Sequence, residues 1–181
     1  MNTIIAKGSW KKTALFTAVF ILLYILINFS AIGVAGLLQI TDGASILDFE
    51  FGYAEDKALA MLTAMGELGR DFYLTKIIPI DFLFPLSYML CYMGWIAMLV
   101  KDIASKGRLK YLLLIPFFAM LFDWTENIGI IFMLKKYPSL PEWAVMTAST
   151  AGILKMICIV MSVLTIAVLL VVFFVKRKRG M

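Results

Sequence analysis

The stretch that decides the fold runs from residue 109 to residue 134 and reads LKYLLLIPFFAMLFDWTENIGIIFML. A helix of this length extends about 39 Å, which is enough to cross the hydrocarbon core of a bilayer, about 30 Å thick. Asp123, Glu126 and Asn127 interrupt the apolar run at intervals of three and four residues, so they share one helix face. The segment is therefore predicted to be a membrane span with a polar face.

The composition of the whole chain agrees with this prediction. Of the 181 residues, 62% are hydrophobic and 16% are charged, and the mean hydropathy is +0.94. A soluble domain is about half apolar and a quarter charged, so a soluble enzyme, a disordered chain and a secreted disulfide scaffold are excluded. The chain has no histidine, and Cys91 and Cys158 form no C-x-x-C pair. We therefore expect neither a metal nor a cofactor.

Three further apolar runs cover residues 13–38, 77–100 and 143–175. The first is too long for the apolar part of a signal peptide and is expected to stay uncleaved. The last is longer than a bilayer requires, so one of its ends should project or tilt. The predicted fold is an all-α integral membrane protein, a four-transmembrane-helix bundle that forms a single domain over residues 1–181.

The distribution of basic residues predicts the orientation of the spans. The N-terminus, the 101–110 loop and the C-terminal tail together carry eleven Lys or Arg and one acidic residue, whereas residues 41–76 and 135–142 carry five bases and eight acids. Positive charge stays on the cytoplasmic side, so both termini are expected there. We expect the inner (plasma) membrane of a bacterium. The basic tail at 176–179 is expected to contact anionic lipid, and no nucleic acid is expected as a partner.

The connection at 41–76 is the only sizeable polar segment outside the spans. Residues 46–51 alternate apolar and acidic side chains and are expected to be extended, and residues 53–74 are expected to form an amphipathic outer helix. Its apolar positions are Ala58, Met61, Leu62, Met65, Leu68 and Phe72. Two interpretations stay open: a helix that rests on the outer leaflet or caps the bundle, and a lid over an opening.

Four charged residues lie inside the predicted spans, away from the membrane interfaces: Asp81, Asp123, Glu126 and Lys155. Each charge at the centre of a bilayer costs about 2.5–3.5 kcal/mol, so these groups are expected to meet in one polar network in the outer half of the membrane. Asp123 is expected to be the partner of Lys155, because their depths match best. The candidate site is Asp81, Tyr88, Asp123, Trp124, Glu126, Asn127 and Lys155, with Asn28, Arg70 and Tyr73 as secondary candidates.

This network has a structural and a functional interpretation. An ion pair between two helices can simply hold them together. Three carboxylates around Lys155 would instead attract a cation, and Tyr88 and Trp124 would suit cation–π contacts with an ammonium group. Arg70 and Tyr73 lie where the outer helix meets the second span. They are expected either to reach lipid phosphates or to cap Asp81.

Short motifs spread over most of the chain are Phe51-Gly52-Tyr53, Gly66-x-x-Gly69-Arg70-x-x-Tyr73, Asp81-x-x-x-Pro85-x-x-Tyr88, Asp123-x-x-Glu126-Asn127 and Tyr137-Pro138. Together they resemble a family of small bacterial four-helix inner-membrane proteins with no assigned function. The resemblance implies the fold and carries no function to this chain.

Three functions follow from the residues. The leading hypothesis is an acidic intramembrane pocket that binds a small cationic or lipidic ligand, in a transporter or an accessory subunit. The alternative is a membrane enzyme that acts on a lipid or isoprenoid, with Asp123 and Glu126 as the acid–base pair and Lys155 beside them. A structural partner of a larger membrane complex is the third. Membrane lipids are expected partners in each case, and the sequence assigns no oligomeric state.

Overall fold

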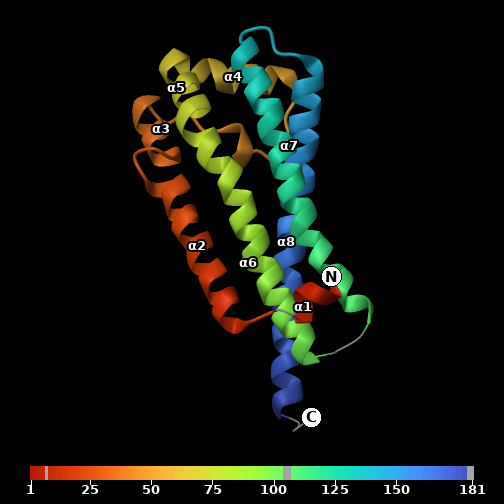
Figure 1. Cartoon of the computed structure of the whole chain (residues 1–181). Helices are drawn as coiled ribbons and strands as arrows, with labels where there is room; N and C mark the ends of the chain where they lie inside the picture. Colours follow the sequence, from red (N-terminus) through yellow and green to blue (C-terminus); the bar gives the residue numbers. More distant parts are fainter. Residues whose placement is uncertain (7, 104–106, 179–181) are drawn as a thin grey trace.

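The computed structural model describes residues 1–6, 8–103 and 107–178, and this part of the chain is 85% helix, with no strand (Figure 1). The helices are α1 (Asn2–Ala6), α2 (Trp10–Phe29), α3 (Val34–Ile40), α4 (Glu55–Ala64), α5 (Gly66–Phe72), α6 (Ile78–Ile103), α7 (Leu114–Lys136) and α8 (Glu142–Lys178). Shorter turns are η1 (Leu47–Phe49), the π-helical η2 (Tyr73–Ile77) and η3 (Arg108–Leu113).

Four helical segments are long and apolar enough to cross a membrane. They are Trp10–Ile40, Gly66–Lys101, Arg108–Lys136 and Glu142–Lys178. Each contains one of the four runs predicted from the sequence, in the same order. The all-helical class and the number of candidate spans are therefore confirmed.

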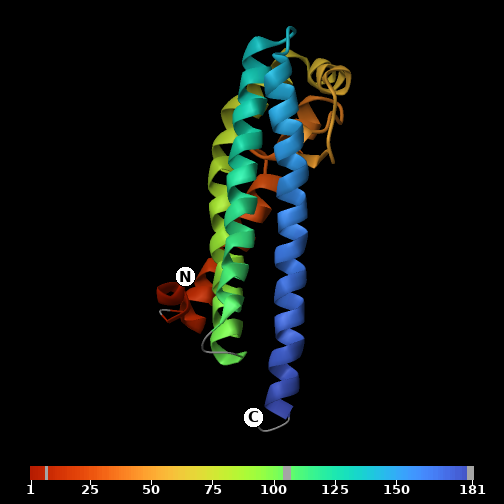
Figure 2. The ribbon, with the colours of Figure 1, turned by 90° about the vertical axis from the view of Figure 1, so that its right-hand side faces the viewer.

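The long helices lie side by side, with α6, α7 and α8 packed against one another and α2 packed on α6 (Figures 1 and 2). α8 has 37 residues, and its C-terminal end projects beyond the other helices, as predicted from its length (Figure 2). α1 lies at this same end, and α4 and α5 lie at the opposite end (Figure 1). Both chain ends on one side are what an even number of crossings requires.

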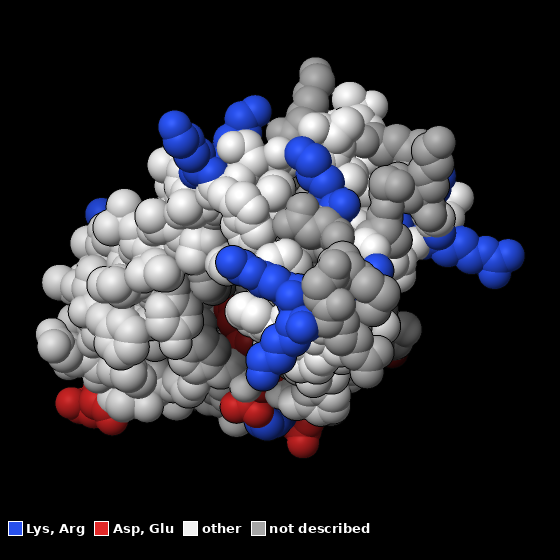
Figure 3. Space-filling model, turned by 90° about the horizontal axis from the view of Figure 1, so that it is seen from below, with Lys and Arg blue, Asp and Glu red and all other residues white. Residues whose placement is uncertain are grey.

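Basic side chains surround the end that carries α1. Figure 3 views this end, where Lys and Arg project on several sides, and acidic atoms are visible deep in a hollow. Two lysines bind backbone carbonyls here: Lys101 Nζ lies 3.5 Å from the Gly8 oxygen, and Lys176 Nζ lies 2.7 Å from the Ile103 oxygen. Lys7, Lys106 and Arg179, three of the bases used to orient the chain, lie outside the described residues. The cytoplasmic location of this end stays a prediction.

The first candidate span covers the predicted run but is not one continuous helix. α2 ends at Phe29, and α3 begins at Val34 after a turn. The Ser30 hydroxyl donates to the Leu26 carbonyl oxygen at 2.6 Å. A Cβ on Gly33 would overlap the Ile27 carbonyl oxygen. The turn therefore depends on a residue without a side chain, and it directs α3 toward α5.

The outer segment also differs from its prediction. Instead of a uniformly extended stretch at 46–51, Leu47–Phe49 form the 3-10 turn η1, with Ile46 and Glu50 extended on either side. The predicted helix at 53–74 is two helices that bend at Gly66, whose φ of +63° favours glycine. The bend changes the helix phase, so Leu68, expected on the packed face, is 78% exposed.

The packed face of α4 is otherwise as predicted. Ala58, Leu62 and Met65 are buried in a hydrophobic cluster formed with α3, η1, η2, α7 and α8. Burial of apolar surface away from water stabilises the fold by about 25 cal/mol for each Å² that is buried. α4 therefore caps the end of the helices opposite α1, and η1 is enclosed beneath it.

Candidate functional site

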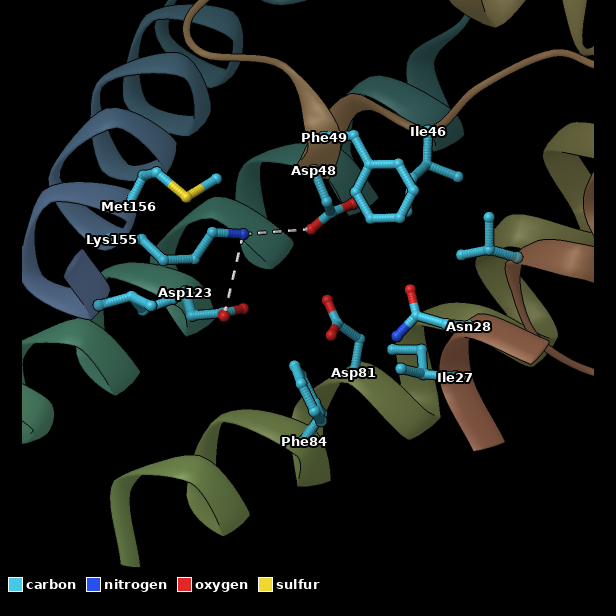
Figure 4. Close-up of a pocket in the computed structure, with 12 residues that line it drawn as sticks. Ile27, Asn28, Ile46, Asp48, Phe49, Asp81, Phe84, Asp123, Lys155 and Met156 are labelled. Carbon is cyan, nitrogen blue, oxygen red and sulfur yellow. Dashed lines mark ion pairs between the residues drawn. The ribbon is translucent and has the colours of Figure 1, made fainter. Parts of the chain in front are cut away.

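The centre of the site is Lys155, a buried lysine on α8 that is 6% exposed. Its Nζ lies 2.5 Å from Glu126 Oε2, 3.7 Å from Asp48 Oδ1 and 3.8 Å from Asp123 Oδ2. Figure 4 shows the ammonium group pointing between Asp48 and Asp123. The sequence prediction that Asp123, Glu126 and Lys155 converge in one network therefore holds.

The closest partner of Lys155 is Glu126, so the choice of Asp123 from matched depth was wrong. Glu126 is completely buried, and its carboxylate occupies space that Gly152 leaves on α8. A Cβ on Gly152 would lie 2.5 Å from Glu126 Oε1. Depth along a helix says nothing about such a gap in the opposite helix, and it is this gap that places Glu126 against Lys155.

Asp48 is a site residue that the sequence reasoning missed. It lies in η1 and is 8% exposed. The buried hydroxyl of Tyr73 donates a hydrogen bond to Asp48 Oδ2. Because Asp48 lies outside the predicted spans, it was counted among the acids of the outer loop. The available signal was an acid between Leu47 and Phe49 in a short segment that has to return to the helices.

Two polar residues hold Asp123 in place between α6 and α7. Tyr88 OH donates to Asp123 Oδ2 at 3.1 Å, and Asn127 Nδ2 lies 3.3 Å from Asp123 Oδ1. Asn127 Nδ2 also lies 3.3 Å from the backbone oxygen of Asp81. Tyr88 and Asn127 are thus brought to the network as predicted, where they position acidic residues.

Asp81 is the acidic residue with the fewest partners. It lies on α6, is 7% exposed, and points into the open space between the helices (Figure 4). Its carboxylate makes no ion pair with the described residues. One carboxylate oxygen from each of Asp48, Asp81 and Asp123 lies within 4.8 Å of the others. Together with Glu126, the network therefore holds four carboxylates and one ammonium group, and three of the carboxylates pair with it.

These groups line one side of a cavity of about 160 Å³ between α2, α6, α7 and α8, with η1 above. Its polar lining is Asn28, Asp48, Asp81, Asp123 and Lys155, and its apolar lining is Ile27, Val34, Ile46, Phe49, Phe84, Met156 and Ile159. Asn28 donates to the Tyr24 carbonyl oxygen at 2.9 Å. Glu126 does not line the cavity and lies behind Lys155.

Tyr88 and Trp124, which would suit cation–π contacts with a ligand, do not line this cavity. Tyr88 is 1% exposed and is engaged by Asp123. Trp124 donates from its ring nitrogen to the Phe82 carbonyl oxygen at 3.0 Å and does not line the cavity. The aromatic residues in the lining are Phe49 and Phe84. Carboxylate groups, more than ring faces, therefore set the chemistry of this cavity.

Arg70 lies elsewhere, and its predicted role beside Asp81 is not seen. Its guanidinium group lies 3.8 Å from the centroid of the Tyr137 ring, and Nη1 donates to the Leu62 carbonyl oxygen at 2.9 Å. The bend between α4 and α5 directs this side chain toward the C-terminal end of α7. Of the two residues paired in that prediction, Tyr73 alone reaches the site, through Asp48.

Tyr53 adds a buried hydroxyl close to the network. Its backbone N–H donates to Ser149 Oγ at 2.8 Å, and its own hydroxyl has no hydrogen-bond partner among the described residues. Burial raises the pKa of Tyr53 above its ordinary value, and the carboxylates of Glu126 and Asp48 raise the pKa further. This phenol therefore stays neutral at physiological pH.

Comparison with known proteins gives no match: no family model, no curated protein and no solved structure is similar to the chain. The resemblance carried by the short motifs stays a prediction. The function is therefore inferred from the geometry and charge of the site.

Proposed function

We propose that the chain crosses a membrane four times and binds a small cation, or the cationic group of a lipidic ligand, in the acidic cavity between α2 and α8. The observation that carries the proposal is the imbalance of buried charge. Asp48, Asp81, Asp123 and Glu126 oppose a single lysine, a formal charge of minus three when all five groups are ionised. Buried charge without a partner is costly, and a bound cation offsets it.

Exposed apolar side chains support placement in a bilayer. On α2, Leu15, Leu22 and Phe29 are 60%, 66% and 68% exposed, and on α8 Val168 and Val171 are 62% and 64% exposed. Apolar surface of this extent is typical of contact with lipid or with another protein. The cavity lies nearer the end that carries α4, which is the outer half of the membrane in the predicted orientation.

The apolar lining supports a ligand with a hydrocarbon part. Ile27 comes from α2, whereas Met156 and Ile159 come from α8. α2 packs on α6 and on α3, so the cavity is bounded by two helices that do not share an extensive interface. A chain of methylene groups could enter between them from the bilayer while its cationic group contacts the aspartates. Transport, or service as an accessory subunit, would build on such binding.

A membrane enzyme acting on a lipid or isoprenoid is the second candidate. The observation in its favour is that Asp123 lines the cavity with Lys155 Nζ 3.8 Å from its carboxylate, an arrangement suited to general acid–base chemistry. Glu126, the other half of the acid–base pair expected from the sequence, is completely buried behind Lys155. Asp81 is better placed to act with Asp123.

Mass spectrometry of the protein released intact from detergent micelles tests the leading proposal. The wild type should retain a cationic species, metal ion or amine, that the Asp81→Asn variant loses. Asp56→Asn, a change at an exposed acid on α4, is the matched control and should retain it. A wild type that carries no cation, or carries the same one as Asp81→Asn, would contradict the proposal. Turnover of added lipid that is lost in Asp123→Asn would instead favour the enzyme.

A further inference from the structure

We propose that the cation is a divalent metal ion of the oxygen-preferring class, Ca²⁺ or Mn²⁺, held by Asp48, Asp81 and Asp123. This inference rests on the proposed function and names the ligand of the same cavity. The three residues come from η1, α6 and α7, so the site exists only when these elements are packed together.

The spacing of the three carboxylates fits such an ion. Their ligand oxygens all lie within 4.8 Å of one another. Ca²⁺ binds oxygen at about 2.3–2.6 Å, so two oxygens on opposite sides of it are about 4.6–5.2 Å apart, and adjacent ones are closer. Mg²⁺ binds at about 2.0–2.1 Å and allows at most about 4.2 Å. The three oxygens therefore lie within the span that one Ca²⁺ ion allows, whereas Mg²⁺ usually keeps several waters and is held by fewer carboxylates.

Asp81 supplies independent support for an absent partner. It is 7% exposed, it points into the cavity (Figure 4), and its carboxylate has no ion pair among the described residues. Buried charged groups are normally paired or coordinate metals. A buried carboxylate that lies beside two others and pairs with no cationic side chain is suited to coordinate a metal ion.

Lys155 does not fill this role, because it is held by Glu126. Its Nζ is 2.5 Å from Glu126 Oε2 but 3.7 Å and 3.8 Å from Asp48 and Asp123. The longer distances lie outside hydrogen-bonding range. No pairing is recorded between Lys155 and Asp81 among the described residues. Lys155 therefore pairs with Glu126, Asp48 and Asp123, and its single charge leaves a net negative charge that a second cation can balance.

The ligand set also selects the class of metal. The polar groups that line the cavity are carboxylate and amide oxygens, amide nitrogen and the Lys155 ammonium. Oxygen ligands suit Ca²⁺, Mg²⁺ and Mn²⁺, whereas Zn²⁺ and Cu⁺ prefer histidine nitrogen or cysteine sulfur. The sequence prediction of no metal rested on the absence of histidine and of paired cysteines, which excludes the second group of ions and not the first.

The test uses the full chain, purified in detergent and freed of metal with EDTA. Adding CaCl₂ or MnCl₂ should raise the melting temperature, followed by tryptophan fluorescence, by a few degrees, with MgCl₂ less effective. Elemental analysis should find one bound ion per chain. Asp81→Asn should weaken the ion's affinity at least tenfold, whereas Asp56→Asn should bind as the wild type does.

The melting temperature of the metal-free protein distinguishes a metal-binding role of Asp81 from a purely structural one. Without metal, Asp81→Asn should melt at the same temperature as the wild type or higher, because it removes one of three crowded negative charges. The metal site would be overturned if metal-free Asp81→Asn melted at a lower temperature than the metal-free wild type. It would also be overturned if Asp81→Asn bound Ca²⁺ and Mn²⁺ as tightly as the wild type does. If metals have no effect but hexylammonium chloride still stabilises the wild type, the inference fails and the proposed function stands. If neither cation stabilises it, both fail.

Discussion

Gly152 on α8 and Glu126 on α7 face each other so closely that a Cβ on the glycine would lie 2.5 Å from Glu126 Oε1. Gly129 approaches α8 in the same way, since its Cβ would lie 2.8 Å from the Ala148 side chain. Small residues on both helices therefore allow a completely buried glutamate to fit between them. This packing fixes the pairing of Lys155.

Gly152→Ala is expected to displace the Glu126 carboxylate and weaken its ion pair with Lys155. Added volume in a packed interface costs about 1–3 kcal/mol, so the free energy of unfolding should fall by about that amount. Unfolding by increasing SDS in mixed micelles measures the loss. Ala167→Val, at an exposed position on α8, is the control and should have little effect. Equal stability of Gly152→Ala and the wild type would show that this contact is not tight.

Lys155→Met is expected to be more destabilising than a double variant that also removes the true partner. Loss of one member of a buried ion pair costs about 3–5 kcal/mol, because the surviving charge stays buried. Adding Glu126→Gln should recover part of that loss. Adding Asp123→Asn should recover less, since its carboxylate is 3.8 Å from Lys155 Nζ rather than 2.5 Å. The reverse order, measured by the same SDS titrations, would restore Asp123 as the partner.

Leu62→Asp is expected to release α4 from the outer end of the helices. Leu62 is completely buried, and removal of a buried leucine side chain alone costs about 2–5 kcal/mol. Hydrogen exchange over Glu55–Ala64 should become much faster. Leu68→Asp is a matched control, because Leu68 is 78% exposed and its replacement should leave exchange unchanged. Fast exchange in the wild type would mean that α4 is not docked.

Tyr73→Phe is expected to loosen η1 by removing the hydrogen bond to Asp48. A hydrogen bond to a charged group contributes about 1.5–3 kcal/mol, and loss of the hydroxyl leaves Asp48 with one buried partner fewer. Hydrogen exchange at Leu47–Phe49 should accelerate. Tyr111→Phe, at a position that is 52% exposed, serves as the comparison. If η1 exchanges at the same rate in both variants, Tyr73 does not hold it.

Both termini are expected on the cytoplasmic side. In a chain whose Cys91 and Cys158 are replaced by alanine, an impermeant thiol reagent added outside cells should label cysteine introduced at Ala60 or Ser139. It should not label cysteine at Arg108, or at residue 105, which lies outside the described residues. Labelling at Arg108 from outside would reverse the orientation derived from the basic residues.

Much of the fold could be predicted from the sequence, because long apolar runs and their 3.6-residue periodicity are local properties. The four candidate spans, the projecting end of α8 and the buried positions Ala58 and Leu62 follow from them. The break after Phe29 and the bend at Gly66 could not be predicted in the same way. Both depend on backbone conformation at single residues and on how α3 and α5 then pack.

The site was predicted in part, for a related reason. The cost of burying charge identified Asp81, Asp123, Glu126 and Lys155 without any structure. It could not identify Asp48, because an acid outside a span has no such cost until the chain folds back over it. Nor could it choose between Asp123 and Glu126 as the partner of Lys155. That choice depends on the space at Gly152, which belongs to another helix.

Titration with a matched pair of small ligands tests most directly the claim that the buried aspartates bind a cation. Hexylammonium chloride and hexanol share the same hydrocarbon chain and differ in charge, so their effects on the melting temperature of metal-free protein isolate the charge. We expect hexylammonium to stabilise the wild type more than hexanol does, and we expect Asp81→Asn to abolish the difference while Asp56→Asn keeps it. Equal effects of the two ligands on the wild type would contradict a cation-binding cavity.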